Sequence, residues 1–446
     1  MFSMSKTFSA QPTKEFFINM LVRDINLQDA IGDLVDNCID GANRLKKGGS
    51  FEGLFINIEV NSDYFTIEDN CGGIDIDIAK KYAFRFGRPD DVEDIKYSIG
   101  QFGIGMKRAL FKIGNLFSID TKTVKNSFLM SVDVNKWRDE KDNWVFEYNN
   151  DRDYSKNQID PSKTGTKITI NELNEDVKTA FVDDLFLQNL QNDLELNQLY
   201  NLNKGLQISF NGHAIKAKNL KVNVSPDFKL GHWETKIKDV SVKLIVGVGS
   251  QQQELGGWYI FCNNRLVVGP DTSELTGWTG RGKGGVANYH HQYFRFRGYA
   301  FFEAEDSEKL PWNTTKTGMN PDSPIFKAVR LEMIEMMKSV INSFLNPLKK
   351  ENESDYEGDK VLNEKLALTT SINITSTNLD SYYAPDRSFV HPQPVGSIKK
   401  VSEGKTKIAF EADKELVNKL KKFFNVNTNP EVGLKAFDYV VKNEIE

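Results

Sequence analysis

The stretch IGDLVDNCIDGA, residues 31–42, constrains the fold of this chain more than any other. Asp33, Asn37 and Asp40 fall at positions i, i+4 and i+7, so their side chains line one narrow helical face. That face suits a coordinated cation or a bound water, whereas an ordinary amphipathic helix would leave the same acids in solvent. Apolar residues at helical spacing predict that the opposite face packs on a core: Leu27, Ala30, Ile31, Leu34, Val35, Cys38, Ile39 and Ala42.

The length and charge of the chain limit its class. With 446 residues, of which 39% are hydrophobic, it exceeds one ordinary core, so we expect a globular protein of two or three domains. The formal net charge is -5 at pH 7, which does not favour a surface that coats nucleic acid broadly. The net charge does not exclude a local basic patch.

Cysteine content and hydropathy indicate the compartment. Cys38, Cys71 and Cys262 are far apart and show no metal-ligand spacing, which fits a reduced, cytoplasmic setting. No apolar run is long enough to span a membrane, and residues 1–17 lack the apolar core of a signal peptide. We therefore expect a cytoplasmic protein without a membrane segment.

Hydrophobic periodicity divides the chain into four parts. Residues 1–175 predict an α+β sandwich, with helices against one face of a mixed sheet. Residues 176–348 predict a second α+β domain with several strands and a long final helix. Residues 349–404 are rich in charge, Ser, Thr, Asn and Pro without a clean period, which predicts a linker. Residues 405–446 predict a small module of one strand and two helices.

A second motif, IEDNCGGID, places Asp69 at the end of a predicted strand, ahead of a glycine turn. A carboxylate in this position can accept a hydrogen bond from an exocyclic amine. Gly73 would let a flat ring approach the backbone, because glycine has no side chain. The competing interpretation is an ordinary hairpin turn.

A third motif, SIGQFGIGMKRALFKIG, places Gly100, Gly103 and Gly105 just before a helix that carries Lys107. Glycine permits positive φ angles, so successive N–H groups can turn towards a phosphate, while the helix N-terminus and Lys107 add positive potential. A fourth motif, KTGTKITI, opens a strand with Thr166, whose hydroxyl can bond a buried carboxylate or a base-bound water. Glycine also marks plain flexibility, so each motif alone leaves its function open.

The order and spacing of the four motifs resemble those of the GHKL ATPase superfamily, which includes gyrase B subunits, heat-shock-90 chaperones, histidine kinases and the MutL and MORC proteins. DLVDNCIDGA is similar to the family motif E-L-x-D-N-S-x-D-A, and DNCGG to D-x-G-x-G. IGQFGIGMKRA resembles the family lid, most closely that of heat-shock-90 and MORC proteins, and TGTKITI resembles the late Gly-Thr motif. The resemblance implies a Bergerat ATP-binding sandwich followed by an S5-like transducer domain.

Carried over to this sequence, the resemblance implies a Mg-ATP site. Asn37 would coordinate the Mg²⁺ that bridges the phosphates. Asp69 would bond the adenine amino group, with Gly73 leaving room for the base and Thr166 supporting Asp69 through a water molecule.

The resemblance also implies the phosphate contacts. Gly100, Gly103, Gly105 and Lys107 would wrap the phosphates. Lys316, in the loop LPWNTTKTGMN, would reach the γ-phosphate from the transducer domain. The alternative for Lys316 is an exposed loop lysine.

Two residues depart from the family pattern. Asp33 stands where most hydrolysing members place the glutamate that activates the attacking water, and Cys71 replaces the first glycine of the second motif. Aspartate is one methylene shorter, and a misplacement of about 1 Å can cost on the order of 100-fold in rate. We therefore expect slow hydrolysis on Asp33, and a backbone at Cys71 that needs no positive φ.

The strand and two helices expected over residues 405–446 resemble a ribbon-helix-helix module, which pairs its strand with that of a partner chain. Ile408 and Phe410 would face the core, while Lys405 and Lys407 would face outwards, where such modules read DNA. The rival interpretation is a plain helical hairpin for self-association or partner docking. We rank dimerisation ahead of DNA reading.

Together these inferences predict an ATPase that acts as a conformational and dimerisation switch. The predicted homodimer would bind ATP and Mg²⁺ and act in a DNA-linked process, such as genome maintenance or defence against foreign DNA. One alternative is a chaperone-like ATPase acting on protein clients, and another is an ATP sensor without useful hydrolysis. The sequence leaves open whether a neighbouring gene product is a further partner.

Overall fold

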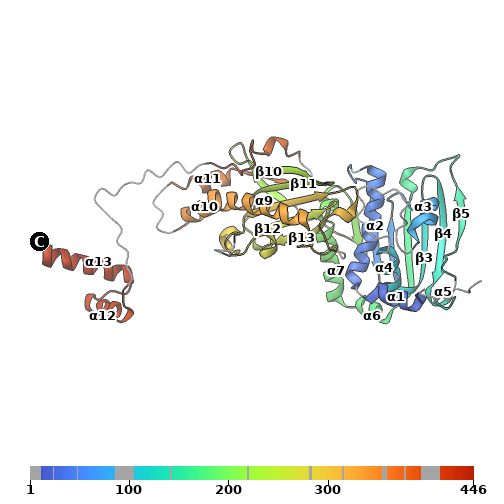
Figure 1. The fold of residues 1–446 in the computed structure, drawn as a ribbon, viewed down its shortest axis with the longest axis horizontal. Coiled ribbons are helices and arrows are strands. Elements are labelled where there is room, and N and C mark those ends of the chain that lie inside the picture. The colour runs from blue at the N-terminus through green and yellow to red at the C-terminus, as the bar shows by residue number, and fades with distance from the viewer. Residues whose placement is uncertain are drawn as a thin grey trace, which may run out of the picture. The chain divides into compact units, whose positions relative to one another are not determined.

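The computed structural model describes residues 12–23, 25–47, 49–85, 105–140, 143–217, 220–280, 284–313, 316–353, 359–375, 378–392 and 412–445. The chain divides into two compact units, Met1–Gln393 and Pro394–Glu446. The first unit contains two large sheets with their own helices, which confirms the α+β class (Figure 1). We call its parts the first lobe (residues 12–217) and the second lobe (residues 220–392). Within the described ranges, no helix has the length and apolar character needed to cross a membrane.

An eight-stranded sheet forms the first lobe, in the order β5-β4-β3-β6-β2-β1-β7-β8. Neighbouring strands are antiparallel, except for the parallel pair β1 and β7. Alternate residues of β1 and β2 are buried, so one face of the sheet packs on helices. The strands are β1 (Phe55–Val60), β2 (Tyr64–Asp69), β3 (Gly114–Lys122), β4 (Asn126–Asp133), β5 (Tyr148–Asp153), β6 (Gly165–Leu173), β7 (Gln207–Phe210) and β8 (His213–Ala214).

Helix α2 (Leu27–Lys46) is the central helix of the first lobe, and most of its residues are buried. It begins at Asn26, whose side-chain oxygen accepts the N–H of Asp29 at 2.7 Å and so caps the helix. It packs on α4 (Gly105–Ile113), which also contacts α1 (Lys14–Arg23). The other helices of this lobe are α3 (Ile76–Ile78), η1 (Ala79–Ala83), α5 (Val134–Asp139), η2 (Pro161–Lys163), α6 (Glu175–Ala180), α7 (Asp184–Asn197) and α8 (Leu199–Asn203).

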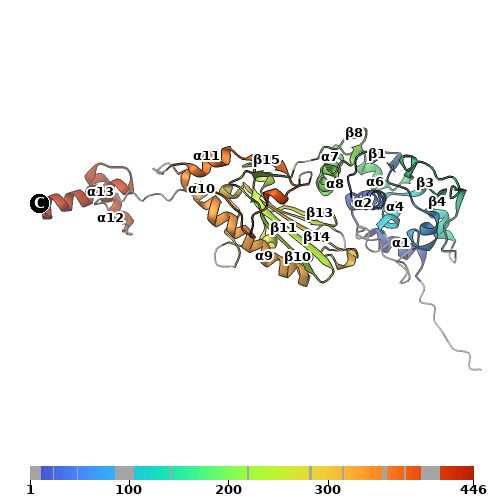
Figure 2. The same cartoon turned by 90° about the horizontal axis from the view of Figure 1, so that it is seen from above.

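A five-stranded sheet forms the second lobe, in the order β10-β11-β14-β12-β13. Figure 2 shows α9 (Pro324–Val340) and β15 (Thr370–Asn373) on opposite faces of this sheet. Alternate residues of β11, such as Leu244 and Val246, lie in the larger apolar core, whereas Ile245 on the other face lies in a second, smaller core. The sheet strands are β10 (Gly231–Ile237), β11 (Val240–Val248), β12 (Gly257–Cys262), β13 (Arg265–Asp271) and β14 (Phe296–Glu303).

Shorter elements complete the second lobe. Strand β9 (Lys221–Val224) pairs with β15 in a separate two-stranded sheet. The remaining helices are η3 (Gln253–Leu255), η4 (Glu274–Thr276), η5 (His291–Tyr293), η6 (Ser307–Lys309), η7 (Ile341–Leu345), α10 (Asn346–Glu351), α11 (Val361–Ala367) and η8 (Asp380–Tyr382).

The structure differs from the expected boundary at residue 175. Strands β7 and β8 lie beyond it, yet β7 pairs in parallel with β1 and extends the first sheet. Ile208 and Phe210 on β7 are buried in the core of that sheet, so the first lobe continues to residue 217. Strand periodicity carries no information about which sheet a strand joins, so it could not assign β7 to the first sheet.

The structure also differs from the linker expected over residues 349–404. Between residues 359 and 392, helix α11 and strand β15 pack on the second lobe. Leu362 and Phe389 are buried there, and Glu351 accepts the N–H of Leu362 at 3.0 Å. The apolar residues that anchor this segment are too irregularly spaced to give a helical or strand period, which is why its composition reads as a linker.

The C-terminal unit, taken by itself, contains α12 (Lys414–Phe424), α13 (Asn429–Val440) and η9 (Val441–Ile445). A capping box between Thr428 and Glu431 starts α13. Two helices lie where the sequence predicted two, residues 405–411 of the expected strand lie outside the described residues, and the ribbon-helix-helix module stays a prediction.

We expect the substitution Leu362→Ala to lower the free energy of unfolding by about 2–4 kcal/mol, because it leaves a cavity at a fully buried position. Leu368→Ala is the matched control: Leu368 lies just beyond the same helix and is 74% exposed, so its loss should cost less than about 0.5 kcal/mol. Urea unfolding of both variants measures the difference. Equal effects would contradict the packing of α11 on the second lobe.

Candidate functional site

The polar face of α2 begins with a buried carboxylate that is held by an arginine. Asp33 receives two hydrogen bonds from Arg108 on α4, at 2.9 Å from Nε and 2.7 Å from Nη2, both to Oδ2. Helix α4 approaches closely here, since a Cβ added at Gly105 would lie 3.0 Å from Oδ2 of Asp33. The start of α4 and the polar face of α2 therefore meet at one point.

A lysine of the second lobe reaches the same place. Lys316 Nζ lies 3.3 Å from Oδ1 of Asp33 and 3.3 Å from Oδ2 of Asp36, and its side chain is only 7% exposed. Its φ angle of 57° is unusual for a residue with a side chain and helps to turn the loop towards α2. The alternative of an exposed loop lysine is thus excluded, although its proposed contact with a phosphate stays a prediction.

Asp36 joins α2 to the second lobe more firmly. The guanidinium of Arg265, at the start of β13, pairs with Oδ2 of Asp36, whose side chain is 1% exposed. Gln198 donates to Oδ1 of Asp36 at 3.3 Å, and Asn201 donates to Gln198 at 2.9 Å. A buried charge needs such partners, so this cluster fixes α2 both to the segment around Gln198 and to the second lobe.

The electrostatics of Asp33 follow from these neighbours. Burial raises the pKa of its carboxyl, but the positive charges of Lys316 and Arg108 outweigh burial and hold the pKa below its usual value. Asp33 is therefore ionised at neutral pH. Its oxygens are engaged by cations, so it is a weak base in this arrangement.

The side-chain oxygen of Asn37 is available to bind a metal ion. Its amide nitrogen donates to the backbone oxygen of Asp33 at 2.8 Å, one helical turn earlier. Among the described residues nothing donates to its side-chain oxygen. An amide oxygen held in this way fits Mg²⁺, a hard cation that takes oxygen ligands and usually keeps only one or two from protein.

Asp69 ends β2 on the buried face of the sheet. Its Oδ1 accepts the N–H of Cys71 at 2.7 Å. Burial raises the pKa of Asp69 to about 6, against the opposing effects of hydrogen bonds from Cys71, Cys38 and Thr166. A buried carboxylate that titrates near neutral pH is a candidate for contact with a ligand.

Thr166 lies beside Asp69, because the register of β2 and β6 pairs the two residues. The next strand, β3, places Thr121 opposite Thr166, and the two hydroxyl oxygens are 3.1 Å apart. Thr121 also accepts the N–H of Ile74, at 2.8 Å, in the glycine turn. A row of polar groups therefore crosses three strands at this end of the sheet.

The backbone of the glycine turn accounts for the residue types at positions 71–73. Positive φ angles fall on Gly72 (97°) and Gly73 (71°) and not on Cys71, as the departure at Cys71 required. A Cβ at Gly73 would lie 2.2 Å from the carbonyl oxygen of Lys122, so close backbone contact already demands glycine there. Whether the base of a ligand also approaches Gly73 stays a prediction.

The third motif is described only in part. Gly100 and Gly103 lie outside the described residues, and Gly105 begins α4. Lys107 is buried, and its ammonium donates to the carbonyl oxygens of Ala83 at 2.9 Å and Arg85 at 2.6 Å. Burial lowers its pKa to about 8. Its role at a phosphate stays a prediction.

Sequence reasoning assigned no role to several residues that the structure brings into the site: Asp36, Arg108, Thr121, Gln198 and Arg265. Asp36 follows Asp33 by three positions, so helical spacing alone could have placed it beside that residue. Arg108 follows Lys107 in the third motif, where the second positive charge was a usable signal. Arg265 and Gln198 carry no local signal, because their partner is more than 160 positions away.

An acidic helical face, an open amide oxygen and a buried carboxylate at the end of a strand are compatible with a nucleotide site. Residues 25–166 match the family model described as "Histidine kinase-, DNA gyrase B-, and HSP90-like ATPase". The matched segment contains the first three motifs and ends at Thr166, and it supports a GHKL-type domain and ATP binding for this part of the chain. The comparison with curated proteins gives no match.

We expect Asp69→Asn to raise the free energy of unfolding by about 2–3 kcal/mol at pH 8 and by almost nothing at pH 4. The folded-state pKa of about 6 lies above the unfolded value of about 3.9, so the folded protein penalises the ionised form. The contribution of Asp69 to stability therefore falls as pH rises through this window. Urea unfolding of the wild type and the variant at several pH values measures it.

The exposed Asp120 on β3 supplies the control, since Asp120→Asn should shift stability equally at both pH values. A difference between wild type and Asp69→Asn that does not change with pH would contradict the raised pKa.

Proposed function

We propose that the first lobe binds Mg-ATP and hydrolyses it slowly. The observation that carries this proposal is the match of residues 25–166 to an ATPase family model, because that segment contains α2, the glycine turn and the start of β6. In this proposal Asp69 accepts a hydrogen bond from the adenine amino group, Gly73 leaves room for the base, and Thr166 supports Asp69 through water.

At the phosphate end, Asn37 would hold Mg²⁺ through its open side-chain oxygen. When bound, the metal would neutralise charge on the phosphate oxygens. Gly105 and Lys107, with Gly100 and Gly103, would contact the phosphates through N–H groups and an ammonium. Rotation of Lys107 away from its two carbonyl partners would be part of nucleotide binding.

The charge balance of the cluster suggests how ATP binding to the first lobe would move the second lobe. Three cations, Arg108, Arg265 and Lys316, face two carboxylates in a buried space. A γ-phosphate would compete with Asp33 for Arg108 and Lys316, because it carries more negative charge than a carboxylate. Asp33 released in this way could orient the attacking water as general base, and Lys316 would carry the second lobe with it.

We expect Asp33→Asn to reduce steady-state phosphate release from Mg-ATP by about 100-fold or more, because loss of a general base typically costs 10²–10⁴-fold. Wild type should turn over slowly but measurably. Asp120→Asn, an exposed change of the same chemistry, should leave the rate unchanged. Binding of a fluorescent ATP analogue checks that each variant retains the site, and equal rates in wild type and Asp33→Asn would contradict Asp33 as base.

A non-hydrolysing ATP sensor is the second candidate, and one observation favours it. Both oxygens of Asp33 are engaged by cations, which opposes its use as a base. The same assay separates the two functions, since a sensor binds the analogue in wild type but releases no phosphate above the Asp33→Asn background.

We further propose that ATP binding drives dimerisation, in a DNA-linked process such as genome maintenance or defence against foreign DNA. The C-terminal unit supports self-association. Among its described residues only Val432 is a buried hydrophobic, whereas large apolar side chains are exposed: Leu416, Leu420, Phe423, Leu434, Phe437, Tyr439 and Val440. A pair of helices this short rarely folds stably with so little buried surface, so a partner surface would stabilise it.

We expect the full chain to form a dimer with Mg-ATP, and the double substitution Phe423→Glu and Phe437→Glu to leave it monomeric. Charges placed on the exposed apolar face oppose its burial. Size-exclusion chromatography with light scattering measures the mass.

A shortened chain that ends at residue 393, after the second lobe, tests whether the C-terminal unit binds DNA. Filter binding of DNA by the full chain but not by the shortened chain would support the DNA-linked role. No binding by either chain would contradict it.

A further inference from the structure

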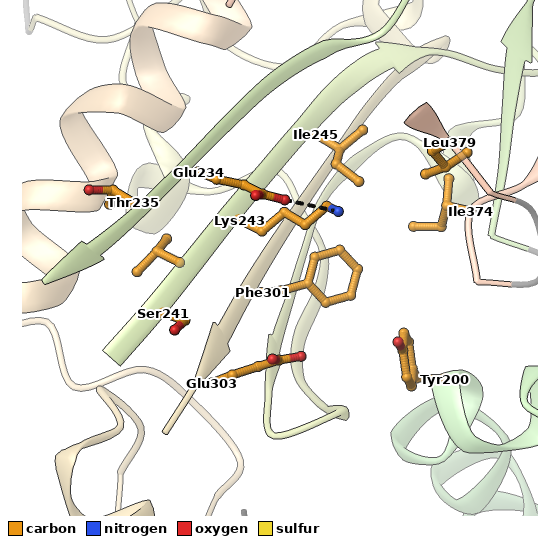
Figure 3. A pocket seen from close by; sticks show the side chains of 11 residues that line it. Tyr200, Glu234, Thr235, Ser241, Lys243, Ile245, Phe301, Glu303, Ile374 and Leu379 are labelled. Atoms are coloured by element: carbon orange, nitrogen blue, oxygen red, sulfur yellow. Dashed lines mark ion pairs between the residues drawn. The ribbon is translucent and has the colours of Figure 1, made fainter. Parts of the chain in front are cut away.

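A pocket that the nucleotide site does not use lies between helix α8 of the first lobe and the sheet of the second lobe. It has a volume of about 560 Å³, within the range typical of small-molecule sites. It opens on the face of the second sheet that lies opposite α9, and Figure 3 shows its side chains. The lining side chains come from α8, β10, β11, β14 and the segment after β15.

The floor of the pocket follows from strand register. Lys243 on β11 pairs with Glu234 on β10 and with Phe301 on β14, so the three side chains form a row across the sheet. Ser241 and Glu303 pair in the next row along the same face. The floor is therefore partly aromatic and partly charged, with both kinds of group fixed by backbone pairing.

Most of the charge on the floor is already satisfied. Glu234 Oε1 lies 3.0 Å from Lys243 Nζ and 3.0 Å from His232 Nε2. The Lys243 ammonium also lies over the ring of Tyr383, 5.3 Å from its centroid. Glu234 and Lys243 thus neutralise each other, and the pocket lining contains one further carboxylate.

That carboxylate is Glu303. Among the described residues it forms no hydrogen bond and has no cation within ion-pair distance, and it is exposed at the pocket. Burial of its surroundings raises the pKa of Glu303, against the more distant charges of Lys204 and Lys243. Among the described residues, the lining therefore contains one carboxylate without a direct ion-pair or hydrogen-bond partner.

Aromatic rings stand next to this charge. Phe301 stacks on Phe261 with centroids 4.9 Å apart, and Tyr200 approaches Phe301 at 5.9 Å. The Tyr200 ring already makes a contact of this kind, because the Lys204 ammonium lies 5.3 Å from its centroid. Flat apolar surface beside a free carboxylate favours a cation that can stack and donate hydrogen bonds together, which a guanidinium does better than an ammonium.

We propose that this pocket binds a guanidinium group carried on an apolar stem, with Glu303 as its carboxylate partner and Phe301 and Tyr200 as its stacking surfaces. Ile374 and Leu379, on the opposite side, contact the stem. The guanidinium comes either from a free small molecule or from an arginine side chain of another protein. This proposal does not rest on nucleotide binding by the first lobe.

Isothermal titration calorimetry of the full chain tests the proposal with three probes. Butylguanidinium represents a free small molecule, and N-acetyl-arginine amide represents an arginine within a protein. N-acetyl-citrulline amide replaces the guanidinium by a neutral urea of nearly the same shape. We expect saturable binding of one molecule for at least one of the first two probes, and none for the third. The tighter of the two guanidinium probes identifies the source.

Two substitutions assign the contacts. Glu303→Gln should weaken binding by about tenfold or more, because it removes a charge-assisted hydrogen bond while keeping the shape. Tyr200→Leu should weaken it by about two- to fivefold through loss of the ring. Glu364→Gln, an exposed change on α11 outside the pocket, should leave binding unchanged.

Unchanged unfolding midpoints confirm that the variants fold. The proposal is overturned if neither guanidinium probe binds saturably to the wild type, if the citrulline probe binds as tightly, or if Glu303→Gln binds with wild-type affinity.

Discussion

The structure of the first unit depends on two carboxylates of α2 that are buried against three cations. Asp33 and Asp36 pair with Arg108, Lys316 and Arg265, which come from α4, from a loop of the second lobe and from β13. Ions this deeply buried are tolerated only when each has a partner, and removing one partner of such a pair typically costs about 3–5 kcal/mol. The cluster therefore does little for net stability but fixes which surfaces of the lobes meet.

The same cluster connects the candidate site to α8, the helix that forms one wall of the second-lobe pocket. Asp36 accepts a hydrogen bond from Gln198, and Gln198 accepts one from Asn201 on α8. Tyr200, between them in sequence, faces the pocket of the second lobe. The short helix α8 thus stands between the polar face of α2 and the second-lobe sheet. Under the proposed function, a change of partner at Asp36 would therefore alter the position of Tyr200 through the hydrogen bonds of Gln198 and Asn201.

Local patterns predicted the elements well where a single period dominates. The apolar stripe of α2 and the alternation in β2 are strong, because one face of each element is buried and the other is not. The same alternation places Asp69 on the buried face with Phe65 and Ile67, so its exceptional environment was inherent in the strand pattern. Residues 359–392 were missed because their few apolar anchors follow no period and find their partners only in the second lobe.

By itself the sequence determined that α2 is a helix with one polar face, that β2 is a strand and that a glycine turn follows it, since these features depend on spacing along one element. Only the tertiary structure decided that Lys316 and Arg265 meet that face, or that Thr121 joins Asp69 through Thr166. Those contacts join residues from 45 to 283 positions apart. No local period encodes such pairings, because they arise when separate elements bury their apolar faces together and bring the remaining charges within reach.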